Sequence, residues 1–243
     1  MDRMAYSTRL LISVLGYVGL YLVAARVDWA LRAPGPGRLR RVAGVARAWL
    51  ETLWLGDIVR ILFYLMGPYW FLTAGWASPV DFGLADLDWI SGVGLTLAIG
   101  FGSLLLLVGI WWQYLRVVGP GYVSSQNRWL AQPHGWAHVL NEVILSEAWW
   151  TVCRSPMLML AGPYLGVYLG LVLVLAAGFL NPRTRAQLAI AGLREEVVLS
   201  GSLAVLSATL YAFVHNLWLC MAMHFVLRWA VLRLMRQGSS MLK

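Results

Sequence analysis

Residues 197–227 read VVLSGSLAVLSATLYAFVHNLWLCMAMHFVL, a stretch of 31 residues that contains no Asp, Glu, Lys or Arg. A single α-helix of this length would measure about 46 Å, whereas the hydrocarbon core of a bilayer is about 30 Å thick. One upright helix is therefore too long for the bilayer. His215 and Asn216 interrupt the apolar pattern in the second half of the stretch, so the sequence predicts two consecutive membrane-spanning helices.

The rest of the chain has the same character. Sixty per cent of its 243 residues are hydrophobic and only 12% are charged. Further uncharged runs, each long enough or nearly long enough to cross a bilayer, occupy Leu10–Ala25, Ile61–Val80, Trp89–Leu115 and Ser155–Pro182. The first run lacks a small-residue cleavage site and is interpreted as the first span. The composition excludes a soluble globule and predicts an all-α, polytopic transmembrane helix bundle that forms one domain over residues 1–243.

The distribution of charge predicts the topology. The net charge is +8, and Arg residues crowd the segment 29–56, which we interpret as a basic cytoplasmic connector. The following loop contains Asp81, Asp86 and Asp88 and no base, so it is expected outside. Continuing the alternation gives about seven spans in the cell membrane, with the N-terminus outside and the C-terminus cytoplasmic. Six spans result if residues 136–153 form an amphipathic or re-entrant segment. Basic residues beside spans require no nucleic-acid partner.

Ionisable residues occur in a segment that otherwise reads as membrane-buried, HVLNEVILSEAWWTVCR at residues 138–154. A charged side chain at bilayer depth costs at least about 2.5–3.5 kcal/mol, so it is rarely kept without a partner or a task. On a helix, Glu147 and Arg154 are seven residues apart and share a face, whereas His138 and Glu142 are neighbours on another. Glu147 is therefore either half of a structural ion pair or a general base that activates water.

The last two predicted spans add His215 and His224. His224 lies in mid-span with Arg228 one helical turn later. A neutral imidazole can polarise a carbonyl, share a proton with a carboxylate or bind a metal. The sequence contains no HExxH-like spacing, so we predict neither a metal site nor a cofactor.

Two segments carry a resemblance to a known family. Residues 147–154 with Ser155-Pro156, and the run NLWLCMAMH at residues 216–224, resemble the first and third motifs of the CPBP superfamily of CAAX prenyl endopeptidases and bacteriocin-processing or immunity proteins. The family's motifs are Glu-Glu-xxx-Arg, Phe/Tyr-xxx-His and His-xxx-Asn. This resemblance implies a multi-helix intramembrane protease, with Glu147 as base, His224 as its partner and Arg154 positioning Glu147.

The chain also departs from these motifs. Ala148 follows Glu147 where the family has a second Glu, and the spacing to Arg154 is seven residues. Residues 156–180 contain no His for the second motif, and Arg228 stands where the third motif has the Asn that stabilises an oxyanion.

An alternative assignment uses a different set of residues. Glu195 and Glu196 supply a Glu pair, and Tyr211 with His215 matches the Tyr-xxx-His spacing, but no Arg follows the pair at the family's position. Interfacial placement beside Arg194 is an ordinary explanation for these acids. We therefore take Glu147, His224 and Arg154 as the first candidate site, with second choices Glu142, His215, Glu195, Glu196 and Arg228.

The sequence supports two hypotheses about function, which belong to different classes of protein. The missing motif elements favour a catalytically degenerate CPBP-like protein that serves as a scaffold or accessory subunit of a membrane complex. The alternative is an active, glutamate-dependent intramembrane endopeptidase. The expected partners are the lipid bilayer and a membrane protein, which is a peptide substrate in the second case and a partner subunit in the first.

Overall fold

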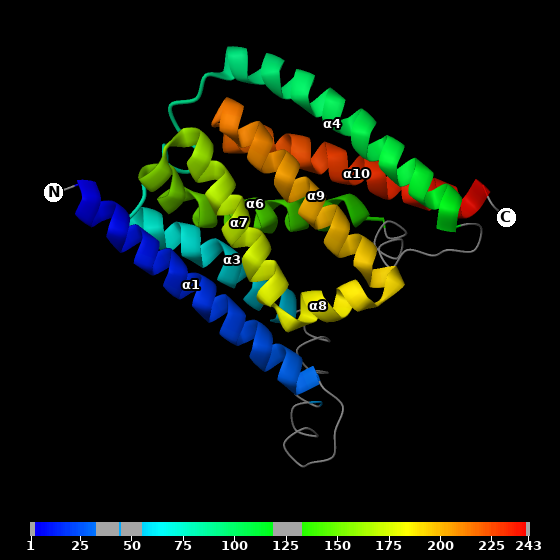
Figure 1. Cartoon of the computed structure of the whole chain (residues 1–243), viewed down its shortest axis with the longest axis horizontal. Helices are drawn as coiled ribbons and strands as arrows, with labels where there is room; N and C mark the ends of the chain where they lie inside the picture. The colour runs from blue at the N-terminus through cyan, green and yellow to red at the C-terminus, as the bar shows by residue number, and fades with distance from the viewer. Residues whose placement is uncertain (1–2, 33–43, 45–54, 119–132, 242–243) are drawn as a thin grey trace.

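The computed structural model describes residues 3–32, 44, 55–118 and 133–241 (Figure 1). All regular secondary structure in these residues is helical, so the all-α prediction is confirmed for them. Most of the predicted basic connector at 29–56 lies outside the described residues. The helices are α1 (Arg3–Arg32), α3 (Leu55–Thr73), α4 (Trp89–Val118), α6 (Gly135–Ala161), α7 (Pro163–Leu180), α8 (Pro182–Ala189), α9 (Ala191–Val214) and α10 (Leu217–Met241).

Five of these helices are long and apolar enough to cross a membrane, namely α1, α4, α7, α9 and α10. The chain is therefore a multi-pass membrane protein. In α3 the apolar part is shorter, Ile58–Thr73, and α6 is a continuous helix of 27 residues that carries the charged groups discussed above. Successive long helices run in opposite directions, and the two termini lie at opposite ends of the bundle (Figure 1). The count of seven spans and the orientation of the termini remain predictions.

The long apolar stretch divides at the predicted position. Helix α9 ends at Val214, His215 adopts a left-handed conformation with φ of 50°, and α10 begins at Leu217. The loop between α3 and α4 closes this break, because the carbonyl of Gly83 accepts a hydrogen bond of 2.9 Å from the Leu217 N–H. Gly83 has φ of +67°, and a Cβ there would lie 2.8 Å from the His215 carbonyl oxygen. Only glycine fits this contact without strain.

Helix α6 occupies the centre of the bundle. It packs against α1, α3, α7 and α10, and its buried residues are distributed around the helix instead of along one stripe. Helix α7 approaches α6 closely through Gly166 and Gly170, which are four residues apart. A Cβ on Gly170 would lie 2.5 Å from the Cα of Arg154. This small-xxx-small packing presses the α7 backbone against the segment of α6 that holds the candidate residues.

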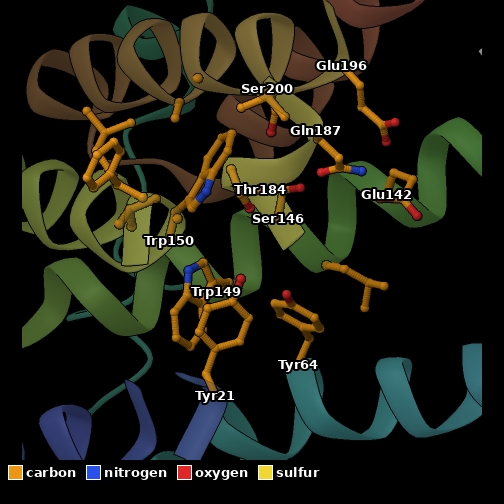
Figure 2. Close-up of a pocket in the computed structure, with 18 of the residues that line it drawn as sticks. Tyr21, Tyr64, Glu142, Ser146, Trp149, Trp150, Thr184, Gln187, Glu196 and Ser200 are labelled. Carbon is orange, nitrogen blue, oxygen red and sulfur yellow. The ribbon is translucent and has the colours of Figure 1, made fainter. Parts of the chain in front are cut away.

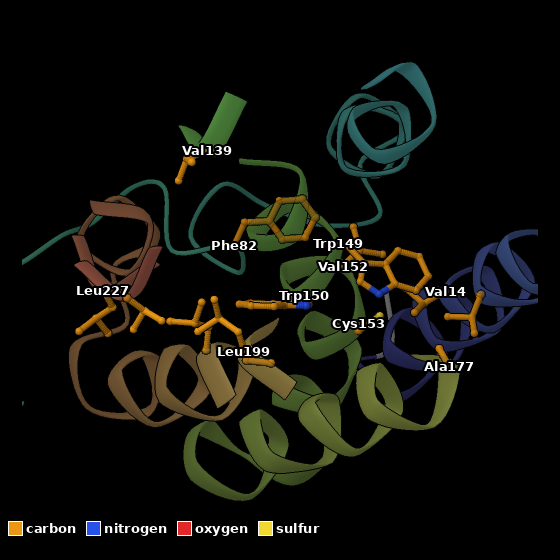
Figure 3. Packing of buried hydrophobic residues seen from close by; sticks show 14 of the residues in the cluster. Val14, Phe82, Val139, Trp149, Trp150, Val152, Cys153, Ala177, Leu199 and Leu227 are labelled. Carbon is orange, nitrogen blue, oxygen red and sulfur yellow. The ribbon is translucent and has the colours of Figure 1, made fainter. Parts of the chain in front are cut away.

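The adjacent tryptophans of α6 extend the core in two directions. Trp149 points toward Val14 of α1, whereas Trp150 points toward Leu199 of α9 and Leu227 of α10 (Figure 3). The two cysteines, Cys153 and Cys220, are buried as free thiols. The core is therefore continuous on both sides of α6.

The predicted topology can be tested by cysteine labelling in intact cells. Val80 in the loop before α4 and Gly44 in the basic segment are both exposed, whereas the native thiols are buried and give little background. A membrane-impermeant maleimide is expected to label Val80→Cys in intact cells and Gly44→Cys only after permeabilisation. Labelling of Gly44→Cys from outside would contradict the assignment of the basic segment to the cytoplasm.

Candidate functional site

Glu147 lies at the middle of α6 and has no exposed surface. Its Oε1 atom is 3.0 Å from Nδ1 of His224 on α10, and it accepts a hydrogen bond of 2.6 Å from the hydroxyl of Ser207 on α9. An ionised carboxylate can accept from both groups when His224 carries its proton on Nδ1. The structure thus brings together Glu147 and His224, which are 77 positions apart in the sequence, and adds Ser207.

Arg154 completes this centre at a longer distance. Its Nη2 atom is 3.9 Å from Oε2 of Glu147, which is beyond hydrogen-bond range, and donates a hydrogen bond of 2.8 Å to the Thr151 hydroxyl. The guanidinium carbon lies 3.6 Å from the centre of the Tyr211 ring, a cation–π contact. Arg154 therefore balances the charge of Glu147 without clamping its oxygens.

The Glu147 centre, defined as Glu147, Arg154, Ser207 and His224, is closed. The Trp150 and His224 rings stack with centroids 5.0 Å apart and an interplanar angle of 3°. Two cavities adjoin the centre, one beside His224 and Ser207 and one beside Arg154, and each measures about 10 Å³. That is the lower limit for a single water molecule. A peptide segment does not fit beside Glu147 in this conformation.

A larger cavity of about 540 Å³ is lined by Trp149 and Trp150 and is not lined by Glu147 or His224. Figure 2 shows Glu142 and Glu196 at one side of this cavity and the α6 tryptophans toward the other. Its polar lining comes from six helices and consists of Tyr21, Arg60, Tyr64, Glu142, Ser146, Thr184, Gln187, Glu196, Ser200 and Arg228. Trp150 thus contacts both the polar cavity and His224 of the Glu147 centre.

Three of the second-choice residues belong to this cavity. Glu142 binds Arg60 of α3 through two hydrogen bonds of 2.5 and 2.6 Å. Arg228 is buried and lines the cavity together with Glu196. Arg228 makes no ion pair with Glu147.

The alternative assignment is not assembled by the fold. Glu195 and Glu196 lie in the first turns of α9, and His215 follows its last residue. His215 follows Glu196 by nineteen positions, which corresponds to about 28 Å along a helix. Glu195 is buried beside Tyr114 of α4. The acids and the imidazole of this assignment therefore lie at opposite ends of one helix.

Sequence reasoning missed Ser207, Trp150 and the partner of Glu142. Ser207 is a small polar residue in the middle of an apolar span, where hydroxyls often form hydrogen bonds between helices. This position is the sequence feature that indicates a role for Ser207 in helix packing. Among the described residues, no group of three or more His, Cys, Asp or Glu side chains is arranged to hold a metal ion.

The chain matches no protein-family model, curated protein or solved structure. The fold and the site therefore define a class, a multi-pass helical membrane protein with a buried Glu–His centre, and assign no family.

The pairing of Glu147 with Arg154 can be tested by stability. Arg154→Leu is expected to destabilise the protein by about 3–5 kcal/mol, because it strands a buried carboxylate. The matched control is Arg233→Leu, because Arg233 is exposed and removing an exposed charge changes stability by about 1 kcal/mol or less. Melting temperatures in detergent are expected to fall far more for Arg154→Leu, and equal, small shifts would show that Glu147 is solvated.

Proposed function

We propose that this chain is a catalytically degenerate relative of the CPBP intramembrane proteases, which uses its bundle to bind a membrane component instead of cleaving one. The observation that carries the proposal is the closure of the Glu147 centre. Glu147 has no exposed surface, and the spaces beside its partners measure about 10 Å³ each.

Hydrolysis would need both room and free acceptor sites at Glu147. A general base must come within about 2.6–3.2 Å of the water proton that it removes. Oε1 is already engaged by Ser207 and His224. Oε2 has no hydrogen-bond donor among the described residues and is a free acceptor, but Glu147 has no exposed surface, so room is the requirement that is not met. Glu147 does not line the 540 Å³ cavity, and Trp150, which does line it, lies against His224. Attack on a peptide carbonyl is therefore blocked in this conformation.

The departures from the family motifs support the same proposal. Losing one oxyanion donor costs about 10²–10³ in rate, and Arg228 replaces that donor while lining the separate cavity. Residues 156–180 supply no second-motif His.

The contact between Glu147 and His224 supports the proposed kinship. The two residues come from the two segments that resemble family motifs, and their side chains are 3.0 Å apart. In a degenerate relative, this pair serves the packing of helices. It links α6 to α9 and α10 through buried polar contacts, which fix how helices dock in a bilayer. These helices also form walls of the larger cavity, so the centre shapes the proposed binding site.

The second candidate function, an active endopeptidase, is favoured by the same short Glu–His distance. It requires Trp150 to leave His224, since this one side chain touches both the larger cavity and the imidazole. The two functions therefore differ in whether opening at Trp150 produces catalysis.

A peptidase assay separates them. Purified protein in nanodiscs is incubated with fluorescent casein and with a library of quenched-fluorescent transmembrane peptides, with an active CPBP protease as positive control. The wild type, Glu147→Gln and Trp150→Ala are all expected to show the same background, because Trp150→Ala widens access without restoring the missing oxyanion donor. Cleavage by the wild type or Trp150→Ala that disappears when Glu147→Gln is introduced would establish the endopeptidase.

A further inference from the structure

The larger cavity contains a buried cation that the described residues leave without a partner. Arg228 on α10 is 6% exposed and lines the cavity, and its guanidinium forms no hydrogen bond or salt bridge with the described residues. The other cation of the cavity, Arg60, is bound bidentately by Glu142. Because a desolvated charge is costly unless paired, Arg228 marks a place for an anion.

The acidic groups nearest to Arg228 do not fill this place. Glu142 and Glu196 both act on Arg228 electrostatically, but Glu142 is committed to Arg60 and Glu196 forms no salt bridge with Arg228. A guanidinium with free donors binds phosphate or carboxylate oxygens through its planar fork. The cavity therefore offers an anion site at Arg228 and a cation site at Glu196.

Neutral hydrogen-bonding groups surround these two charges. Ser146, Thr184 and Gln187 lie in the cavity between the α6 tryptophans and Glu196 (Figure 2). With Arg60 and Glu142 neutralising each other, the remaining charges are one positive and one negative. This pattern is complementary to a zwitterion.

The cavity opens beside lipid. Leu175 and Phe179 of α7 both line it and are 43% and 64% exposed, and α7 is one of the five candidate spans. Arg60 and Glu142, a partly exposed ion pair, stand at its rim. An apolar edge next to a charged rim suits a molecule with its polar head in the cavity and its chains along α7. A volume of about 540 Å³ lies within the usual range for small-molecule sites.

We propose that this cavity binds the headgroup of an amine-bearing zwitterionic phospholipid, with the phosphate on Arg228 and the ammonium group on Glu196. The inference rests on the proposed function, in which the bundle binds instead of cleaving. It adds the chemical class of the ligand and the two residues that recognise it.

Native mass spectrometry of the delipidated protein in detergent tests this assignment. The probes are short-chain phosphatidylethanolamine, phosphatidylglycerol and phosphatidylcholine. Phosphatidylethanolamine is expected to bind most tightly, and Arg228→Gln is expected to weaken it about tenfold or more, because the phosphate loses its charged partner. The matched control is Arg233→Gln, on the same helix but exposed, which is expected to leave binding unchanged. Equal binding by the Arg228 and Arg233 variants would overturn the proposal.

Glu196→Gln tests the other end of the headgroup. It is expected to reduce the preference for phosphatidylethanolamine over phosphatidylglycerol, which has no amine, without weakening phosphatidylglycerol. Equal affinities of the wild-type protein for the two lipids would show that the ammonium group is not recognised, and would overturn the proposal. This comparison needs no variant, so it holds even if Arg228→Gln fails to fold. Glycerophosphoethanolamine, which has no acyl chains, is expected to bind more weakly than the lipid, and equal binding would identify a soluble ligand instead.

The outcomes also separate this inference from the function on which it rests. If the wild-type protein cleaves no peptide and binds the lipids with equal affinity, only the lipid assignment is overturned. Peptide cleavage that depends on Glu147 overturns the proposed function, whatever the lipid measurements give.

Discussion

The hydrogen bond between Glu147 and His224 is the interaction on which the arrangement of the bundle depends. A carboxylate at the centre of an apolar bundle must be matched by donors and by positive charge, because it is shielded from bulk solvent there. His224 and Ser207 supply the donors from α10 and α9, and Arg154 supplies the charge from α6 itself. The hydrogen bonds to this one carboxylate therefore constrain how α6, α9 and α10 pack. Gly170 of α7 packs against Arg154 of α6.

The same interaction explains why the protein has two polar regions of opposite character. Around Glu147 the Oε1 atom is engaged by Ser207 and His224, whereas Glu147 Oε2, Arg154 Nε and His224 Nε2 have no hydrogen-bond partner among the described residues, and Trp150 stacks on His224. Beyond Trp150, the cavity keeps Arg228 and Glu196 without hydrogen bonds and opens beside the lipid-exposed face of α7. The first region resembles a catalytic centre in composition and is closed, whereas the second is open and lacks the Glu–His pair. This separation favours binding over hydrolysis.

The sequence predicted those features that depend on one helix at a time. The charge-free stretch at 197–227 predicted both α9 and α10 and the break at His215, because a bilayer limits helix length. Helical periodicity placed Glu147 and Arg154 on one face. The approach of His224 to Glu147 followed only from the family resemblance. Ser207, the stacking of Trp150 and the Arg60–Glu142 pair depend on how separate helices dock, which no local spacing encodes. Arg60 illustrates this, because its partner Glu142 is 82 positions away in the sequence and lies on another helix.

The closure of the Glu147 centre can be measured directly by carboxyl footprinting. The native protein in nanodiscs is treated with a water-soluble carbodiimide and glycine ethyl ester, and modification of each Glu is followed by mass spectrometry. Our account predicts that Glu196, which faces the open cavity, is modified while Glu147 stays unmodified until the protein is denatured. Modification of Glu147 at the rate of Glu196 in the native protein would show that water and reagents reach the centre, and would contradict the account.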